Sequence, residues 1–342
     1  MPITAQWHTS LGATMIETVD GTVVEGYGDL AAEYASLTSA LALVDRSHRG
    51  RLRATESDRL RFFHAMCTQP IATLPVGRHV DALFCNKKGK VLAMTRLCVL
   101  ADSLLIDVNG ASRAALLAWL ERHIIGDWVE LADESEHLGC LSLIGDGAAA
   151  LLERVGLPSP PQEGEQLTSG DALIVSSRRF GRPSVDLVAP YDALAPRFAD
   201  WATTAQPVGR RAIELLEIER GAPRYGVDLT EENLPQEAGL DAFISYDKGC
   251  YVGQETIARL HYRGRAARSL VALAIDGHAE VDPDCPIHRD GEEVGRITRS
   301  AAFSGWGEVK ALGYLKRDTE LGEGFAVDGR RARALFQVGE RR

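Results

Sequence analysis

The segment Asp247–Glu255 concentrates residue types that could do chemistry. It reads DKGCYVGQE and holds Cys250 between Gly249 and Gly253. Glycines let a backbone turn tightly or approach a ligand closely, so the spacing predicts that Cys250 sits on a defined loop. Lys248 is two residues away, and a nearby ammonium group stabilises a thiolate. Cys250 is therefore the candidate reactive thiol, with Lys248 as its activating partner.

Positive charge gathers in and after this segment. The window 247–268 holds five basic residues against two carboxylates, a balance of +3, in a chain of formal net charge -10. The basic residues are Lys248, Arg259, Arg263, Arg265 and Arg268. Arginine suits planar, bidentate partners such as carboxylate or phosphate, so the window predicts an anion site. A buried cysteine in a glycine turn, beside a solvated basic face, is the plainer interpretation, and it stays open.

Polar and aromatic neighbours extend the candidate site. Gln254 and Glu255 can pair with amide-like edges of a ligand. Tyr251 could stack on a flat ring or anchor the loop in the core, and both remain open. The six cysteines of the chain are scattered and none lies in a C-x-x-C pair. This spacing indicates neither a zinc ribbon nor a cluster-binding run, so no metal site is predicted.

Composition bounds the class of protein. A chain of 342 residues is too long for one ordinary core and indicates two or three domains. Hydrophobic residues make up 45% and charged residues 25%, as in soluble globular proteins. The acidic total disfavours general duplex binding. The opening MPITAQWHTS does not read as a signal segment and no long apolar run is present, so we expect a cytoplasmic protein without membrane contact.

Strands and helices alternate through the first two thirds of the chain. Helices are expected at 28–43, 57–68, 112–123, 147–155, 191–203 and 210–221, the second of them capped by Ser57. A β-hairpin is expected at 79–100 around the turn 86–90. No G-x-G-x-x-G accompanies these elements, which argues against a dinucleotide fold. From Arg268 onward, short strands at near-regular spacing predict a small barrel, with a boundary near Gly264.

The run K-G-C-Y-x-G-Q-E at 248–255, followed by Arg263-Gly264, resembles the signature of the YgfZ-type folate-binding relatives of the glycine-cleavage T-protein. Other blocks follow in the order of that family and cover most of the chain. Residues 43–53 are similar to its D-x-S-x-x-G strand, and 67–77 to its T-x-D segment, with Pro70 in place of the aspartate. Residues 221–240 resemble the T-protein stretch that ends in P-x-E-A-G-L, and 295–314 resemble its terminal barrel more weakly.

The resemblance implies an α+β fold, a three-domain T-protein-like ring that ends in a C-terminal β-barrel and holds tetrahydrofolate. The implied domains are a folate-binding core formed by 1–50 and 140–262, a second α+β domain at 51–139, and the barrel at 263–342.

The resemblance also implies a function. It indicates a tetrahydrofolate-binding accessory protein for iron–sulfur cluster assembly or repair, with iron–sulfur client or assembly proteins as partners. In bacteria it further implies an effect on tRNA modification, and thus a tRNA contact. The alternative is a folate-dependent one-carbon transferase, moving an aminomethyl or methyl group. A binding module that recruits RNA or a protein through the basic window is a third hypothesis.

Site residues carry over position by position. Asn109 matches the family's N-A-S turn near the folate, although an ordinary Asn-Gly turn at the end of a strand would show the same sequence pattern. Glu219 and Glu255 could bind the amide and amino edge of the pterin. The residues that could hold the glutamate tail are Arg259, Arg263 and Arg265.

Three positions depart from the T-protein pattern. Where the T-protein has a G-G-x-x-D-D run, the carboxylates are replaced by Ala93 and Met94. Arg182 stands where a glutamate would grip the pterin, and Glu217 where an arginine is usual. A positioned carboxylate supplies proton transfer and charge stabilisation worth orders of magnitude in rate. The ordinary aminomethyltransferase reaction is therefore not expected, and whether the protein is an enzyme stays open.

Overall fold

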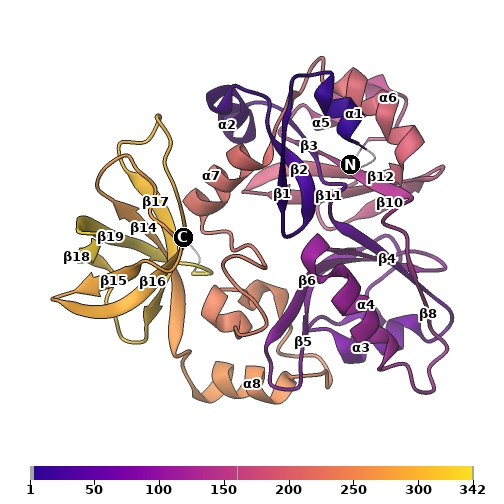
Figure 1. The fold of residues 1–342 in the computed structure, drawn as a ribbon. Coiled ribbons are helices and arrows are strands. Elements are labelled where there is room, and N and C mark those ends of the chain that lie inside the picture. Colours follow the sequence, from indigo (N-terminus) through magenta and orange to yellow (C-terminus); the bar gives the residue numbers. More distant parts are fainter. Residues whose placement is uncertain (1–3, 160, 341–342) are drawn as a thin grey trace. The chain divides into compact units, whose positions relative to one another are not determined.

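The computed structural model describes residues 4–159 and 161–340 (Figure 1). The chain divides into two compact units. Unit 1 comprises Met1–Ala82 and Ala93–Ile213, and unit 2 comprises Leu83–Leu92 and Glu214–Arg342. The predicted domain limits at 50/51, 139/140 and 262/263 stay a prediction, and their outermost residues, 1–3 and 341–342, lie outside the described part of the chain.

A six-stranded sheet forms the first part of unit 1. Its strand order is β10-β11-β12-β9-β3-β13. The strands are β3 (Ala42–Asp45), β9 (Leu138–Ile144), β10 (Gln166–Ser169), β11 (Ala172–Arg179), β12 (Arg182–Pro190) and β13 (Gln206–Pro207). Helices α5 (Ala148–Arg154) and α6 (Tyr191–Trp201) contribute to its core. Leu43, Leu141, Leu194 and Trp201 are fully buried there, so this face provides the apolar burial that holds the sheet.

A five-stranded sheet, in the order β5-β6-β7-β4-β8, lies in unit 1 except for the ends of β5 and β6 within Leu83–Leu92, which belong to unit 2. Its strands are β4 (Gly50–Thr55), β5 (His79–Cys85), β6 (Val91–Val99), β7 (Leu104–Val108) and β8 (Glu130–Asp133), with helices α3 (Arg59–Met66) and α4 (Arg113–Glu121). The predicted hairpin at 79–100 is confirmed as β5 and β6. Its turn is closed by the Asn86 side chain, which accepts bonds from the amides of Lys88 (2.9 Å) and Lys90 (3.1 Å).

Four short elements begin unit 1. They are α1 (Ala5–Thr9), β1 (Thr14–Thr18), β2 (Gly21–Gly26) and α2 (Leu30–Ser39). The Asp29 carboxylate caps α2 by accepting a bond from the Ala32 amide at 3.0 Å. This helix is shorter than the predicted 28–43 because Ala42 already belongs to β3.

Unit 2 holds a closed six-stranded barrel, in the order β14-β17-β16-β15-β18-β19. The strands are β14 (Arg268–Ile275), β15 (Pro286–Arg289), β16 (Glu292–Ala301), β17 (Val309–Lys316), β18 (Gly322–Val327) and β19 (Arg330–Gln337). Leu273, Ile287, Val309 and Val327 are fully buried inside it. The predicted C-terminal barrel is confirmed. Helix α7 (Arg210–Arg220) and helix α8 (Gln254–Arg263) precede the barrel in the chain.

One local prediction was wrong, and one helix was not predicted. Residues 254–263, for which no helix was expected, form the helix α8. Asp58 rather than Ser57 stands at the N-cap of α3, and it makes no side-chain capping bond there. Its carboxylate instead accepts a bond from the Trp128 amide at 2.9 Å, which ties α3 to the chain just before β8.

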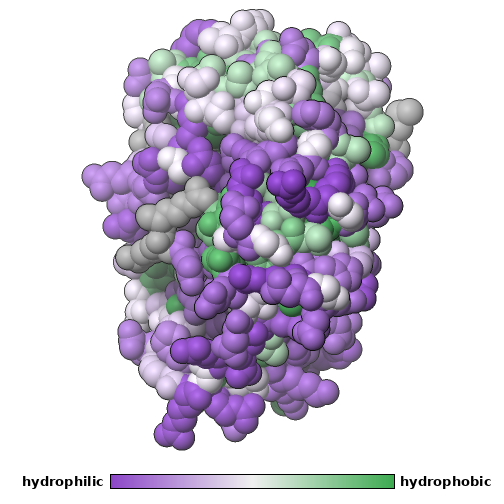
Figure 2. Space-filling view, turned by 90° about the vertical axis from the view of Figure 1, so that its left-hand side faces the viewer, coloured by the Kyte–Doolittle hydropathy of each residue, from purple (hydrophilic) through white to green (hydrophobic). Residues whose placement is uncertain are grey.

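The surface is largely hydrophilic where the space-filling view shows it. In Figure 2, polar residues cover most of the left-hand face of Figure 1 and surround a smaller apolar area. None of the helices in the described ranges is long and apolar enough to cross a bilayer.

Candidate functional site

Cys250 is the exposed member of the six free cysteines. Cys67, Cys85, Cys98 and Cys140 are buried and Cys285 is half-buried. Cys250 lies in an irregular segment just before α8, so a solute or partner can reach its thiol.

The neighbours of Cys250 contact one another. The Lys248 ammonium lies 4.9 Å from the centroid of the Tyr251 ring, a cation–π contact. Tyr251 itself is buried, which supports its role as an anchor of the loop. The predicted action of Lys248 on Cys250 stays a prediction.

Two glycines, Gly253 of the motif and Gly89 of the hairpin turn, allow the turn to pack on the start of α8. Gly253 is the N-cap of α8, with φ +89°, and a Cβ there would lie 2.5 Å from the Asn86 carbonyl oxygen. Gly89 has φ +76°, and a Cβ there would lie 3.1 Å from Thr256 Cβ. Positive φ and close backbone approach both demand glycine. The turn 86–89 therefore packs directly against the segment that carries Cys250.

The remaining predicted residues of this segment lie on or beside α8. Gln254 is half-buried in the first turn, while Glu255 is exposed. Arg259 and Arg263 are exposed on the same helix. Arg265 lies 3.7 Å from Asp318 with both side chains strongly exposed, a pair that contributes little. Their roles in binding folate stay predictions.

Glu219 already holds an ion pair. The Lys310 ammonium lies 2.5 Å from its carboxylate and 4.3 Å from the centroid of the Trp306 ring. A pterin that used Glu219 would have to share this carboxylate with Lys310.

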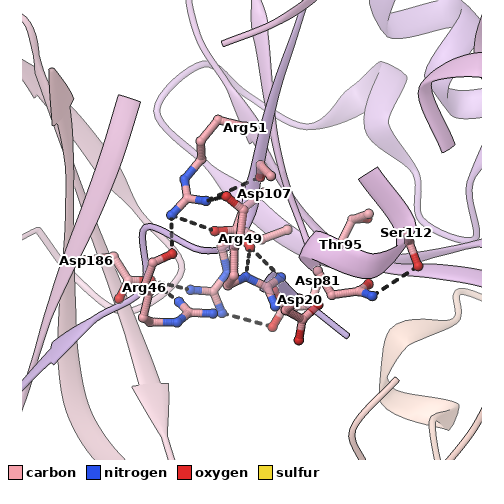
Figure 3. Close-up of polar contacts among 12 residues, drawn as sticks. Asp20, Arg46, Arg49, Arg51, Asp81, Thr95, Asp107, Ser112 and Asp186 are labelled. Carbon is pink, nitrogen blue, oxygen red and sulfur yellow. Dashed lines mark hydrogen bonds and ion pairs between the residues drawn. The ribbon is translucent and has the colours of Figure 1, made fainter. Parts of the chain in front are cut away.

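Asn109 carries a buried acceptor without a partner. Its Nδ2 donates to Ser112 Oγ at 3.0 Å, drawn in Figure 3. Its Oδ1 is buried and has no hydrogen-bond partner among the described residues. An unsatisfied buried acceptor costs about 1–3 kcal/mol. An N–H donor of a bound ligand, such as an amino or amide group of a pterin, would satisfy it.

The departures from the T-protein pattern have structural explanations. Ala93 is fully buried on β6 and Met94 is half-buried beside it, so neither offers a proton-transfer group. Arg182 caps the end of α2. Its Nη1 lies 3.0 Å, 3.2 Å and 2.7 Å from the backbone carbonyls of Ser36, Leu37 and Ala40, respectively. The guanidinium group is therefore committed to backbone carbonyls rather than to a ligand.

Glu217 stabilises two arginines of unit 2. Its carboxylate lies 2.6 Å from Arg224 and 2.8 Å from Arg299. Burial alone would raise the pKa of Glu217, but the two guanidinium groups outweigh it and hold that pKa below its usual value. The carboxylate belongs to this ion-pair network.

Sequence reasoning missed a group of arginines in unit 1, partly shown in Figure 3. We call Arg46, Arg49, Arg51, Arg96 and Arg179 the arginine cluster. The Asp186 carboxylate forms ion pairs with three of these guanidinium groups: Arg46 at 3.3 Å, Arg96 at 3.4 Å and Arg179 at 2.5 Å.

A second carboxylate, that of Asp107, forms ion pairs with the other two arginines of the cluster. Arg49 lies 2.5 Å and Arg51 3.7 Å from Asp107. Burial would raise the pKa of Asp107 and of Asp186, yet the guanidinium groups hold both pKa values far below the usual range. No local pattern signals this cluster, because its five arginines come from three separate segments of chain and pair with carboxylates from other segments.

Comparison with known proteins agrees with this architecture. Residues 4–159 match the family model described as the GCVT N-terminal domain. A protein named as a chloroplastic transferase in Arabidopsis thaliana is 27% identical over 307 residues, which is 86% of this chain and 70% of that protein. The aminomethyltransferase of Rubrobacter xylanophilus is 27% identical over 329 residues, covering 92% of this chain and 87% of the relative.

A solved structure supports the fold directly. The glycine cleavage system aminomethyltransferase T from Bartonella henselae superposes with a TM-score of 0.88 at 19% identity, covering 98% of this chain and 96% of that one. The chain therefore has the fold of aminomethyltransferase T, as the resemblance of its sequence motifs predicted.

Proposed function

We propose that this protein binds tetrahydrofolate and exchanges a one-carbon group with it, in a reaction other than ordinary aminomethyl transfer. The observation that carries the proposal is the unpaired, buried Oδ1 of Asn109, in a chain with the fold of an aminomethyltransferase. Relatives that cover most of the chain are named aminomethyltransferases, which supports folate chemistry over a role as a mere scaffold.

Asn109 suits a pterin because it offers a fixed acceptor. Its side chain is 7% exposed and is held by Ser112, so Oδ1 points in a defined direction. Tetrahydrofolate carries amino and amide N–H donors on its pterin ring. A donor placed at Oδ1 would remove the desolvation penalty that the empty acceptor carries.

The reaction differs from ordinary aminomethyl transfer because its carboxylates are absent at Ala93 and Met94. Without them, the protein lacks at these positions the group that would move a proton or stabilise a developing cation near the folate. A quaternary methylammonium donor fits the remaining residues better. Its carbon–nitrogen bond breaks as the methyl carbon bonds to a folate nitrogen, so the amine leaves as a neutral group without a general acid, and the proton of the folate nitrogen passes to solvent.

Calorimetric titration with tetrahydrofolate tests the binding step. Asn109→Ala should weaken binding by about tenfold or more, since a lost ligand hydrogen bond is worth about 1.5 kcal/mol. Ser112→Ala removes the bond that orients the Asn109 side chain but keeps Oδ1, so it should weaken binding less than Asn109→Ala does. Equal affinity of Asn109→Ala and wild type would refute the role of Asn109.

Turnover tests the chemical step separately. We expect the protein, incubated with tetrahydrofolate and a quaternary methylammonium donor, to form a methylfolate and the demethylated amine, both of which mass spectrometry detects. Tight folate binding with no turnover at high enzyme concentration would leave a binding function and exclude the transferase.

The exposure of Cys250 supports a second candidate function, an accessory role in iron–sulfur cluster assembly or repair of the YgfZ type. Cells that carry Cys250→Ala should then lose activity of iron–sulfur enzymes, whereas Cys285→Ala, at a half-buried thiol, should not. Full activity with Cys250→Ala would remove this candidate. The associated tRNA contact predicts salt-dependent tRNA binding, and no binding at low salt would end it.

A further inference from the structure

The arginine cluster contains more positive than negative charge. Its five guanidinium groups face three carboxylates, which leaves an excess of two positive charges. The three carboxylates are Asp81, Asp107 and Asp186. Asp81 forms an ion pair with Arg96 at 2.7 Å.

Burial makes this excess costly. The Arg51 side chain is fully buried, and those of Arg46, Arg96 and Arg179 are 14%, 12% and 20% exposed. Water screens charges poorly at such positions. Burial and the neighbouring guanidinium groups lower the pKa of Arg46 and of Arg179, although Asp186 opposes both shifts. The side chains of Arg46, Arg96 and Arg179 are thus not sealed from solvent.

Unused donors lie in and beside the same cluster. Among the described residues, Arg51 Nε and Arg179 Nε are buried without a hydrogen-bond partner, and so is His79 Nδ1. Burial, reinforced by Arg96, lowers the pKa of His79 to about 4, so the ring is neutral at pH 7. Depending on its tautomer, a neutral imidazole donates one N–H, which an oxyanion can accept.

We propose that the arginine cluster binds a small oxyanion that carries two negative charges, of the phosphate or dicarboxylate type. Two negative charges balance the excess, and oxygen acceptors match the planar forks of arginine. The site lies within unit 1 and uses none of the residues assigned to folate. It therefore stands independently of the proposed one-carbon chemistry.

Titration of the dialysed full chain tests the site. Inorganic phosphate and glutarate are each added at fixed ionic strength and compared with chloride, with calorimetry and the thermal midpoint as readouts. We expect phosphate, glutarate or both to bind and to raise the midpoint, whereas chloride should not. If phosphate alone binds, the natural ligand is of the phosphate type. If glutarate alone binds, the natural ligand is a dicarboxylate. Equal effects of all three salts would overturn the proposal without any variant.

Variants then locate the site. Arg179→Gln removes one guanidinium group and should weaken anion binding by about tenfold or more, because hydrogen bonds to charged groups are the stronger kind. Arg154→Gln, on α5 of the same unit, is the matched control, since Arg154 forms an exposed pair with Asp200. Unchanged affinity in Arg179→Gln, or an equal loss in both variants, would place the anion elsewhere.

Discussion

Replacing Gly253 by alanine tests the packing of the turn 86–89 on the start of α8. At φ +89° an L-residue pays about 1–2 kcal/mol for the left-handed backbone. The new Cβ would also lie 2.5 Å from the Asn86 oxygen and 3.1 Å from Gly89 Cα. Both neighbours are backbone atoms, so relieving the overlap adds about 1–3 kcal/mol. The free energy of unfolding should fall by about 2–5 kcal/mol in total.

Gly291→Ala separates the two contributions. Gly291 also lies in unit 2 and has φ +85°, but a Cβ there would meet nothing within 4 Å. This control should lose only the backbone contribution. The entropy of unfolding grows with chain length, so each kcal/mol lowers the thermal midpoint by about 1.4 °C for a chain of 342 residues. Gly253→Ala should therefore melt about 1–4 °C below Gly291→Ala.

The assay is thermal unfolding, combined with amide hydrogen exchange. Exchange should accelerate in the turn 86–89 and in the first turn of α8 for Gly253→Ala, and in neither for Gly291→Ala. Equal midpoints and equal exchange in the two variants would show that the turn does not depend on this close approach.

Two further variants probe the positions that depart from the T-protein pattern. Arg182→Gln should lower the free energy of unfolding by about 1–3 kcal/mol, because three helix-end carbonyls lose a charged donor. The control Arg178→Gln should change it little, because Arg178 makes one exposed bond to a backbone carbonyl. Denaturant unfolding of both variants measures the difference. The carboxylate of Glu217 has its pKa held low in the folded state, so its stabilisation is present above the unfolded pKa of about 4.3 and is lost as the pH falls through the lower folded value. Glu217→Gln should therefore be less stable than wild type at pH 7, and the difference should shrink below about pH 4. The exposed control Glu323→Gln should show no such dependence, and a gap that persists at low pH would refute the ion-pair account.

The sequence predicted well wherever local patterning decides the structure. Alternating apolar residues and the Asn86 turn are enough to specify the hairpin of β5 and β6. The barrel strands followed from their spacing. Helix α8 was not predicted from the sequence. Ile257 is its one buried residue, so the segment lacks the apolar repeat that indicates a helix.

The arginine cluster could not be predicted for a different reason. Arg46, Arg49 and Arg51 lie close in sequence, and such residues normally mark a solvated face. Their burial depends on Asp107 and Asp186, more than 50 residues further along the chain. No sequence periodicity indicates ion pairs between residues so far apart in the chain, because these pairs form only when the two sheets of unit 1 have formed.

The positions that replace the T-protein's functional residues are constrained by the fold of this chain. Arg182 closes the end of α2, and Glu217 holds Arg224 and Arg299, so neither side chain can be exchanged for its T-protein counterpart without a cost in stability. Ala93 is fully buried, and a carboxylate in its place would be desolvated. Restoring the carboxylates alone should therefore destabilise the protein before it restores aminomethyl transfer. Any chemistry that the protein performs on folate has to rely on other groups, and the exposed Cys250 and the unpaired oxygen of Asn109 are two that the fold leaves available.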